Sequence, residues 1–327
     1  MILGLVEHDG GKASDASSEM LTLGRRLAQA QGVSLHAIVI GGEGRSLADR
    51  LAAYGVSAVH LVTHEHLGEY APAAWAQGVV EVMRAAGACA VLAVGSDRGN
   101  ELLAHVAAKA RLPLAANCIA IEPGEPGQPY RVTRLRWGGS LLEEARLTGS
   151  PKLLTIAPHT VAAAPAPAPA EVAVHEITPT LSAQDLRVRV TGRIQAARGG
   201  VSLAEARVVV TGGRGVGSAE GFRTIEELAG LLGGAVGCSR AVTSLGWRPH
   251  TDQVGQTGTR VAPDIYIACG VSGAIQHMVG CKAAKRILAV NTDPEAPIMA
   301  SAHYAVIGDL HEVIPAVVTE VRRRKGR

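Results

Sequence analysis

The chain has 327 residues, of which 47% are hydrophobic and only 3% aromatic, and its formal net charge is +3. A chain of this length predicts about two domains. Nucleic-acid binding is disfavoured, because it needs a basic field and aromatic rings on which bases can stack. No apolar run has the length of a transmembrane helix, and residues 1–7 lack the basic start of a signal peptide.

The five cysteines are widely spaced, and they form neither a C-x-x-C pair nor a Cys/His grouping with zinc spacing. This pattern predicts reduced, mostly buried thiols rather than a disulfide framework, because stable disulfides belong to oxidising compartments. We therefore expect a cytoplasmic protein without a metal site.

The first part of the chain alternates short apolar runs with helical patterns. Strands are predicted at residues 2–6, 35–40, 59–62 and 90–94, and helices at residues 18–29, 47–54, 73–86 and 96–110. Such alternation is typical of a parallel sheet flanked by helices and joined by right-handed crossovers.

The pattern changes after Ile119, where a turn-rich stretch is followed by predicted strands at 130–137 and 152–156. These strands favour a hairpin-like, antiparallel edge. Residues 162–170 alternate Ala and Pro, so they predict a polyproline-type connector, because proline lacks the backbone donor that a helix or a central strand needs. Order-forming residues continue at 172–177 and 185–190.

A second alternating run begins at Arg207. Its predicted strands are 208–210, the start of 235–242, 265–269, 287–290 and 303–307, and its predicted helices are 222–232, a helix from 274, and 310–324. The fold class is therefore α/β, with two three-layer domains built on mostly parallel sheets. We place the first at residues 1–195, including the connector near 158–170, and the second at residues 196–327.

A glycine cluster, Gly212-Gly213-Arg214-Gly215-Val216-Gly217, lies between a predicted strand and a helix. Backbone N–H groups at such a junction favour a phosphate, and Arg214 could hold a diphosphate. The dinucleotide fingerprint is incomplete because Ser218 stands where a glycine is needed, and no Walker lysine is present. A structural turn and an anion-binding loop remain equally compatible with this pattern.

Two further loops carry polar and small residues. The loop Gln253-Val254-Gly255-Gln256-Thr257-Gly258 has little to bury and suits a flat polar ligand, although without context a plain surface loop is favoured. The stretch from Gly270 to His277 follows an apolar strand, at the edge where open α/β sheets bind ligands. His277 alone is more often a structural histidine than a functional one.

Polar residues at the other strand ends converge on the same edge. Asn291 and Asp309 each end a predicted strand, although either could cap the next helix. Ser239 and Arg240 offer a hydroxyl and a fixed cation, which suit charge stabilisation better than bond cleavage. No nucleophile–base pair is visible. The sequence therefore predicts a long ligand with a phosphate part and a flat polar part.

These segments together resemble the electron transfer flavoprotein alpha subunit. The residues that carry the resemblance are Gly212 to Gly215, Gly237-Cys238-Ser239-Arg240, Gln253 to Gly258, Val261 to Tyr266, Ser272 to His277 and Asn291 to Ile298. The match is dense and in order over residues 207–320. In the first domain, residues 95–110 and 130–156 are similar to the corresponding stretches of the family's N-terminal domain.

The resemblance implies a heterodimer with a beta subunit and an FAD held by a doubly wound second domain. In the family pattern, Thr257 faces flavin N5, His277 approaches the C2 carbonyl, and Arg240 lies over the ring and favours its anionic reduced forms. The implied cofactor-binding residues are Arg214, Ser239, Arg240, Gln253, Val254, Gly255, Gln256, Thr257, Gly258, Ser272, Gly273, Ala274, Gln276, His277, Asn291 and Asp309.

The implied function is electron carriage rather than stand-alone catalysis. The FAD would accept electrons from flavin dehydrogenases, such as those of fatty acid β-oxidation, and pass them to a quinone oxidoreductase at the membrane. One alternative is a bifurcating complex with a second FAD on the beta subunit. Alternatives of other classes are a nucleotide-binding oxidoreductase acting directly on a small substrate, and a flavin-free regulatory or scaffold subunit.

Overall fold

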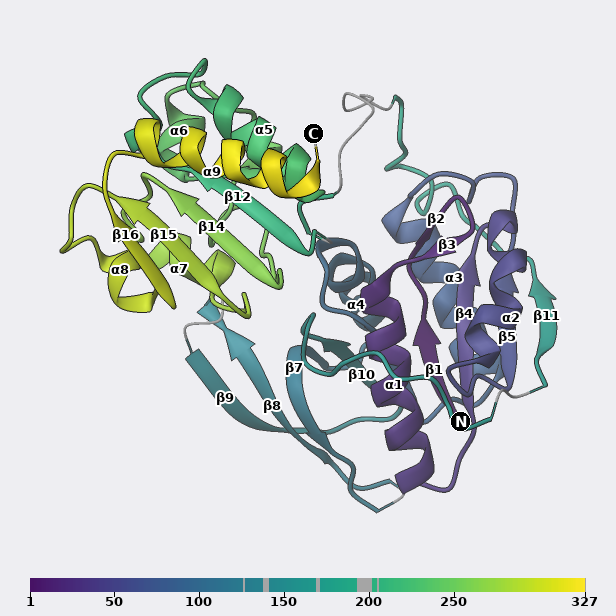
Figure 1. Ribbon diagram of the computed structural model, residues 1–327. Coiled ribbons are helices and arrows are strands. Elements are labelled where there is room, and N and C mark those ends of the chain that lie inside the picture. Colours follow the sequence, from purple (N-terminus) through teal and green to yellow (C-terminus); the bar gives the residue numbers. More distant parts are fainter. Residues whose placement is uncertain (126, 138–140, 169–170, 193–201, 205, 327) are drawn as a thin grey trace. The chain divides into compact units, whose positions relative to one another are not determined.

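The computed structural model describes residues 1–327 apart from 126, 138–140, 169–170, 193–201, 205 and 327 (Figure 1). The chain divides into two compact units, Met1–Ile194 and Gln195–Arg327. The boundary predicted at 195–196 lies outside the described residues, as do residues 169–170 of the predicted connector. Each unit is a mixed α/β body with a mostly parallel sheet, which confirms the predicted fold class.

The first unit is built on a nine-stranded sheet in the order β11-β5-β4-β1-β6-β10-β7-β8-β9. The strands are β1 (Ile2–Leu5), β4 (Leu35–Ile40), β5 (Ala58–Val62), β6 (Ala90–Val94), β7 (Leu114–Glu122), β8 (Tyr130–Arg136), β9 (Leu141–Leu147), β10 (Lys152–Ile156) and β11 (Ala173–Ile177), with a small separate pair, β2 (His8–Asp9) and β3 (Lys12–Ala13). The antiparallel edge is formed by β7, β8 and β9. In contrast, β10 lies inside the sheet and runs parallel to both of its neighbours.

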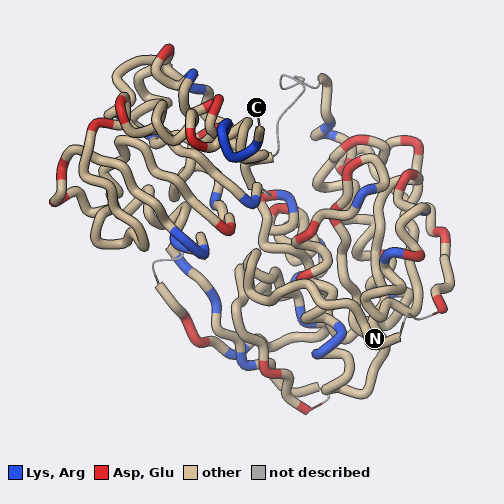
Figure 2. The backbone as a smooth tube through the Cα atoms, viewed as in Figure 1, with Lys and Arg blue, Asp and Glu red and all other residues tan. Residues whose placement is uncertain are grey.

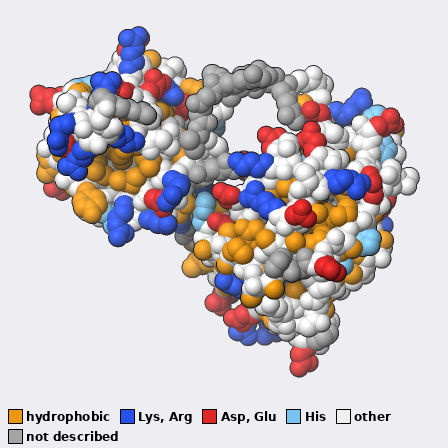
Figure 3. Space-filling model, turned by 45° about the vertical axis from the view of Figure 1, so that its right-hand side comes forward, with side chains coloured by type: hydrophobic (Ala, Val, Ile, Leu, Met, Phe, Trp, Pro, Cys, Tyr) orange, Lys and Arg blue, Asp and Glu red, His pale blue; other side chains and the backbone are white. Residues whose placement is uncertain are grey.

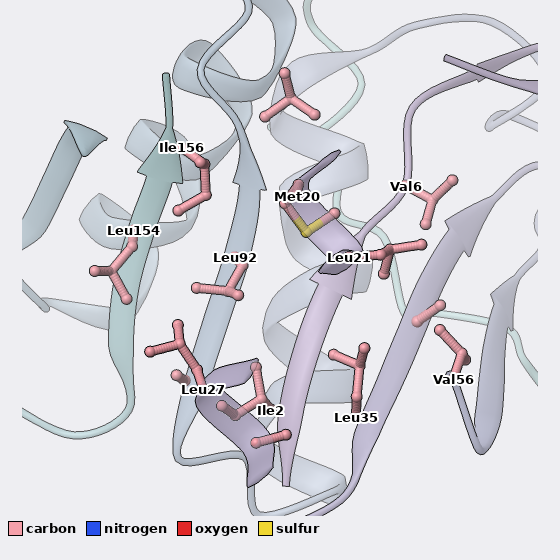
Figure 4. Close-up of a cluster of buried hydrophobic side chains, with 14 of the residues drawn as sticks. Ile2, Val6, Met20, Leu21, Leu27, Leu35, Val56, Leu92, Leu154 and Ile156 are labelled. Atoms are coloured by element: carbon pink, nitrogen blue, oxygen red, sulfur yellow. The ribbon is translucent and has the colours of Figure 1, made fainter. Parts of the chain in front are cut away.

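Helices cover both faces of this sheet. They are α1 (Asp15–Ala30), α2 (Ala48–Ala52), α3 (Pro72–Ala85) and α4 (Asp97–Ala110), with the 3-10 turn η1 (Gly42–Leu47) before α2. One core packs α1 against the sheet through Met20, Leu21 and Leu27 (Figure 4). The other packs α3 and α4 against the opposite face. The helix predicted at 47–54 is present as the shorter α2, directly after η1, and residues 185–190 form neither helix nor strand.

Hydrogen bonds to neighbouring elements hold the described part of the Ala/Pro connector. The guanidinium of Arg25 on α1 donates to the carbonyl of Ala164 at 2.9 Å and to that of Tyr54 at 3.2 Å. The backbone N–H of Ala164 donates to the hydroxyl of Thr22 at 3.0 Å, and that of Ala166 to the carbonyl of Ala53 at 2.7 Å. The connector therefore crosses α1 and α2 before β11 joins the edge strand β5.

The second unit is a five-stranded, wholly parallel sheet in the order β13-β12-β14-β15-β16. Its strands are β12 (Val208–Gly212), β13 (Ala235–Cys238), β14 (Ile265–Cys269), β15 (Ile287–Asn291) and β16 (Tyr304–Ile307). Its helices are α5 (Phe222–Leu232), α6 (Arg240–Ser244), α7 (Ile275–Cys281), α8 (Pro297–Ser301) and α9 (Leu310–Lys325), with 3-10 turns η3 (Arg214–Val216) and η4 (His250–Asp252).

Two cores hold this sheet between its helices. Phe222, Ile225 and Leu228 of α5 pack with Ile314 and Val318 of α9 on one face. The other face packs against α7 and α8 through Cys281 and Ile298. Helices on both faces of an open parallel sheet define a doubly wound unit, in which strand order reverses between β12 and β14.

Charge is distributed without a dominant sign. Basic and acidic residues are interspersed along the tube of Figure 2 and on the face shown in Figure 3, with a short basic run at the end of α9. Within the described residues, no helix combines the length and apolar character needed to cross a bilayer. All five cysteines are free, and four of them are buried.

Candidate functional site

The loops that follow β12 and β14 meet at the point where the strand order reverses. Gly213 donates its N–H to the carbonyl of Cys269 at 2.9 Å, and Gly215 donates to that of Gly270 at 3.1 Å. A Cβ at position 213 would overlap the carbonyl oxygen of Gly270 and lie 2.6 Å from Cα of Val271. These glycines are therefore required by close approach of two backbones, and the crevice at a switch point is where such sheets bind ligands.

Two arginines stand at this edge with exposed side chains. Arg214 opens η3 directly after β12, and Arg240 opens α6 directly after β13. Neither makes an ion pair with any residue that the structure describes. Ser239, the residue before Arg240, donates its N–H to the carbonyl of Gly212 at 3.0 Å, which fixes the start of α6 beside the glycine loop. Two exposed cations without an ion-pair partner in the described part of the chain suit an anionic ligand such as a diphosphate.

The loop Gln253 to Gly258 is folded back against α7. The N–H of Val254 donates to the carbonyl of Cys238 at 2.9 Å, and the N–H of Gln256 donates to the carbonyl of Gln276 at 2.7 Å. The side chain of Val254 is buried in the core, so only its main chain can reach a ligand. Gln256 and Thr257 are exposed. The predicted loops 253–258 and 272–277 are thus neighbours in space.

Gln253 is only 2% exposed, and its side-chain amide is engaged on both sides. The amide nitrogen lies 3.0 Å from the hydroxyl of Thr257, and the amide oxygen lies 2.7 Å from the hydroxyl of Thr243. Its side chain therefore supports the loop. Thr243 was missed by sequence reasoning, and nothing local in the sequence marks it, because its partner is ten residues away.

The turn before α7 is shaped by small residues. Gly270 and Gly273 have φ values of 63° and 80°, which are left-handed conformations that favour glycine. A Cβ at Gly273 would lie 2.5 Å from Cβ and from the backbone nitrogen of Ile298, so this glycine also allows α8 to pack against the turn. Ser272 accepts a hydrogen bond at its carbonyl from the N–H of Ile298 at 3.1 Å. Ala274 then stands at the N-cap of α7.

The imidazole of His277 is turned into the core and is 7% exposed. Its Nε2 lies 2.8 Å from the hydroxyl of the fully buried Tyr266. Burial lowers the pKa of His277 to about 4 and raises that of Tyr266 well above 10, so both groups are neutral near pH 7. Nδ1 of His277 is buried and has no hydrogen-bond partner among the described residues.

The last two predicted residues make different contacts. The amide of Asn291 donates to the carbonyl of Val271 at 3.0 Å, which joins the end of β15 to the turn after β14. The carboxylate of Asp309 accepts from the N–H of His311 at 2.9 Å and caps α9. The helix-cap alternative is therefore realised for Asp309.

The corresponding edge of the first unit is closed by its own side chains. Its strand order also reverses, between β1 and β6, and there Glu7 accepts a hydrogen bond from Ser96 at the start of α4. Because Gly99 has no side chain, the Glu7 carboxylate can lie beside that helix turn. Burial raises the pKa of Glu7 above its usual range. A carboxylate thus already lies at the α4 N-terminus, where an anion would bind.

The second unit therefore has the fold and loops of a doubly wound cofactor-binding protein. Its glycine turns bring the loops after β12 and β14 together, and its two exposed arginines and polar loop match the diphosphate and the flat ring of a flavin dinucleotide. The described residues contain no cluster of His, Cys, Asp and Glu that could hold a metal ion.

Comparison with known proteins gives the family. Residues 202–282 match the electron transfer flavoprotein FAD-binding domain, and residues 2–182 match the electron transfer flavoprotein domain. The chain belongs to the electron transfer flavoprotein alpha subunit family, as its sequence predicts, and its cofactor is FAD.

Relatives match over nearly the full length. The chain is 33% identical to the electron transfer flavoprotein subunit alpha of Thermoanaerobacterium thermosaccharolyticum, covering 98% of this chain and 97% of that protein. It is 35% identical to the protein of the same name from Mycobacterium leprae, covering 98% of each. It is 36% identical to Protein FixB of Bradyrhizobium diazoefficiens, covering 98% of this chain and 88% of that protein.

Proposed function

We propose that this chain is the alpha subunit of a heterodimer with a beta subunit and that the second unit holds the FAD through which electrons pass. With FAD bound, the heterodimer would carry electrons from flavin dehydrogenases, as in fatty acid β-oxidation, to a quinone oxidoreductase at the membrane. The free thiols accord with a cytoplasmic location. The proposal rests chiefly on the convergence of the exposed loops after β12, β13 and β14 at one sheet edge.

The chain's own residues bind and orient the cofactor, and FAD supplies the electron-transfer chemistry. Arg214, whose side chain is exposed at the start of η3, would hold the diphosphate. Thr257 would hydrogen-bond N5 of the ring, and Arg240 would lie near the ring, where its cation would favour added negative charge. His277 would approach the C2 carbonyl through its buried Nδ1, the ring nitrogen that has no partner among the described residues. The other predicted residues of the edge complete the binding loops.

A direct oxidoreductase acting on a small substrate has less support. Catalysis of that kind needs an acid or base poised near neutral pH. His277 is instead buried, paired with Tyr266 and low in pKa, while Asp309 caps a helix. Apart from the Asp309 carboxylate, the exposed polar side chains among the described site residues are cations, amides and hydroxyls, which suit binding and charge stabilisation.

The test is to co-express the chain with a beta subunit encoded beside it and to record the visible spectrum and flavin content of the purified complex. We expect flavin absorbance and one FAD per heterodimer, with the flavin reduced by an acyl-CoA dehydrogenase and its substrate. Two FAD per heterodimer would favour the bifurcating alternative. A complex without flavin would contradict the proposal and would favour the scaffold alternative.

A further inference from the structure

Three side chains form a continuous hydrogen-bonded row behind the exposed face of the 253–258 loop. The hydroxyl of Thr243 on α6 lies 2.7 Å from Oε1 of Gln253, and Nε2 of Gln253 lies 3.0 Å from the hydroxyl of Thr257. Gln253 is buried, Thr243 is half-buried and Thr257 is exposed. The row therefore connects α6 to the one hydroxyl of this loop that faces outward.

The Thr243 hydroxyl has a single proton but two acceptors within reach. The carbonyl of Arg240, one helical turn back, lies 2.9 Å from it, and Oε1 of Gln253 lies 2.7 Å away. A hydroxyl donates only one hydrogen bond and can accept others. A glutamine amide has nearly the same shape with its oxygen and nitrogen exchanged. The same heavy-atom positions are therefore compatible with two complete hydrogen-bond arrangements.

In the first arrangement, Thr243 donates to Oε1 of Gln253, and Nε2 of Gln253 donates to Thr257. Because Thr257 then accepts from inside, its own proton is left to donate outward. In the second arrangement, Thr243 donates to the carbonyl of Arg240, and the amide turns so that Nε2 donates to Thr243. Thr257 now donates inward to Oε1, and its oxygen is left to accept from outside.

We propose that Thr243, Gln253 and Thr257 are a reversible relay that lets Thr257 donate to a ligand atom in one redox state and accept from it in the other. N5 of a flavin is an atom that changes in this way, because it accepts a hydrogen bond when the ring is oxidised and carries a proton when the ring is reduced. The inference rests on the proposed function, in which Thr257 faces N5. Electrons come from the dehydrogenase and the proton from solvent, and no bond to the protein forms or breaks.

Within this relay Gln253 and Thr243 are positioning residues, because they act on the ligand only through Thr257. If Thr257 could only donate, it would lose its hydrogen bond to the reduced ring, and if it could only accept, it would lose its hydrogen bond to the oxidised ring. Gln253 and Thr243 remove this loss by letting Thr257 change its role. An unmatched donor or acceptor in a buried contact loses a hydrogen bond and leaves its partner unsatisfied. Both redox states thus keep a complete hydrogen-bond network.

The variant Thr243→Val tests the relay because it keeps the shape of the side chain and removes the hydroxyl. Gln253 then keeps its nitrogen on Thr257, since an unpaired buried carbonyl oxygen is tolerated better than an unpaired N–H. Thr257 becomes a fixed outward donor, which favours oxidised flavin. We expect the equilibrium constant for flavin reduction in the heterodimer to fall about two- to tenfold, the equivalent of one hydrogen bond. Thr243→Ser keeps the hydroxyl and serves as the matched control.

Spectroelectrochemical titration measures this effect, with flavin content determined on the same samples. Equal potentials in Thr243→Val and Thr243→Ser, with FAD bound in both, would overturn the relay and leave the proposed function intact. A wild-type complex without flavin would overturn both. Neutron diffraction of deuterated crystals gives a second readout. We expect the Gln253 amide deuterons beside Thr257 in the oxidised complex and beside Thr243 in the reduced complex, and one orientation in both states would also refute the relay.

Discussion

The hydroxyl of Tyr266 lies 2.8 Å from Nε2 of His277, and both rings are enclosed by the core on the α7 side of the second sheet. The pair connects the middle of β14 to the helix that follows the same strand. Because Tyr266 remains a neutral phenol, its hydroxyl can donate to Nε2 or accept a proton from it. In either case the contact fixes the orientation of the His277 ring.

This burial makes the second unit sensitive to acid. The pKa of His277 is lowered from 6.5 to about 4 by burial, so below pH 6.5 the unfolded chain binds a proton that the folded chain rejects. The stability from the neutral imidazole is complete above pH 6.5 and declines as the pH falls towards 4, by up to about 1.4 kcal/mol per pH unit. We expect His277→Gln to have a flatter decline, measured by urea unfolding at several pH values between 7.5 and 4.5. A decline as steep as that of the wild type would show that His277 does not contribute.

The glycine loop offers a steric test of the site. In Gly213→Ala the new methyl group would overlap the Gly270 carbonyl, and backbone cannot yield as a flexible side chain does. We expect loss of FAD from the purified complex and a fall in the free energy of unfolding of about 1–3 kcal/mol, as for overpacked sites. Both can be followed by flavin absorbance and thermal unfolding.

Gly230→Ala is the matched control for that substitution. Gly230 lies in α5, and no atom lies within 4 Å of an added Cβ. Alanine stabilises a helix interior relative to glycine by about 0.5–1 kcal/mol. We therefore expect a slightly more stable protein with its full flavin content. If both variants lost FAD to the same extent, the close approach of the two loops would not be the cause.

Much of the second sheet and its ligand edge could be predicted, because neighbouring residues in the sequence determine it. The central strands of both sheets are short apolar runs, and the glycine turns follow them directly, so β12, β14 and the loop at Gly212 could be located from neighbouring residues alone. The sheet edge then follows from topology, because the carboxyl ends of parallel strands meet there. The same reasoning places Arg214, Arg240 and Thr257 on that edge.

The features that could not be predicted depend on distant partners. Strands β7 and β9 mix polar and apolar residues, and their pairing in the sheet decides their structure. Strand β10 has the apolar sequence of a central strand, yet the sequence favoured a hairpin-like edge there because β9, which lies between β8 and β10, was not predicted. The commitment of the Gln253 amide to Thr243 likewise depends on how α6 is placed against the loop.

The exposed cation of Arg240 gives an electrochemical prediction. A cation near the ring stabilises added negative charge, so Arg240→Ala should make the midpoint potential of bound FAD more negative. Arg240→Lys keeps the charge without the planar fork, and its potential should lie between those of the wild type and the alanine variant. Reductive titration of the three heterodimers measures the order. If the alanine and wild-type potentials coincided, Arg240 would not lie near the ring.

The Ala/Pro connector yields a prediction for the first unit. Arg25 donates to the carbonyls of Ala164 and Tyr54, and these bonds hold a segment that has few backbone donors of its own. In Arg25→Met the aliphatic stem remains, but both carbonyls lose a charged donor. Hydrogen bonds to charged groups contribute about 1.5–3 kcal/mol, so the described part of the connector should detach more readily from α1.

Limited proteolysis and hydrogen exchange measure that detachment. The N–H of Ala166 donates to the carbonyl of Ala53 in the wild type, and we expect it to exchange faster in Arg25→Met. We also expect faster cleavage within residues 158–168. The FAD content should stay at the wild-type level, because the second unit is unchanged. Arg26→Met is the control, since Arg26 is the next residue of α1 and is exposed. Equal protection of the connector in both variants would mean that the prolines and the pairing of β11 with β5 hold it without help from Arg25.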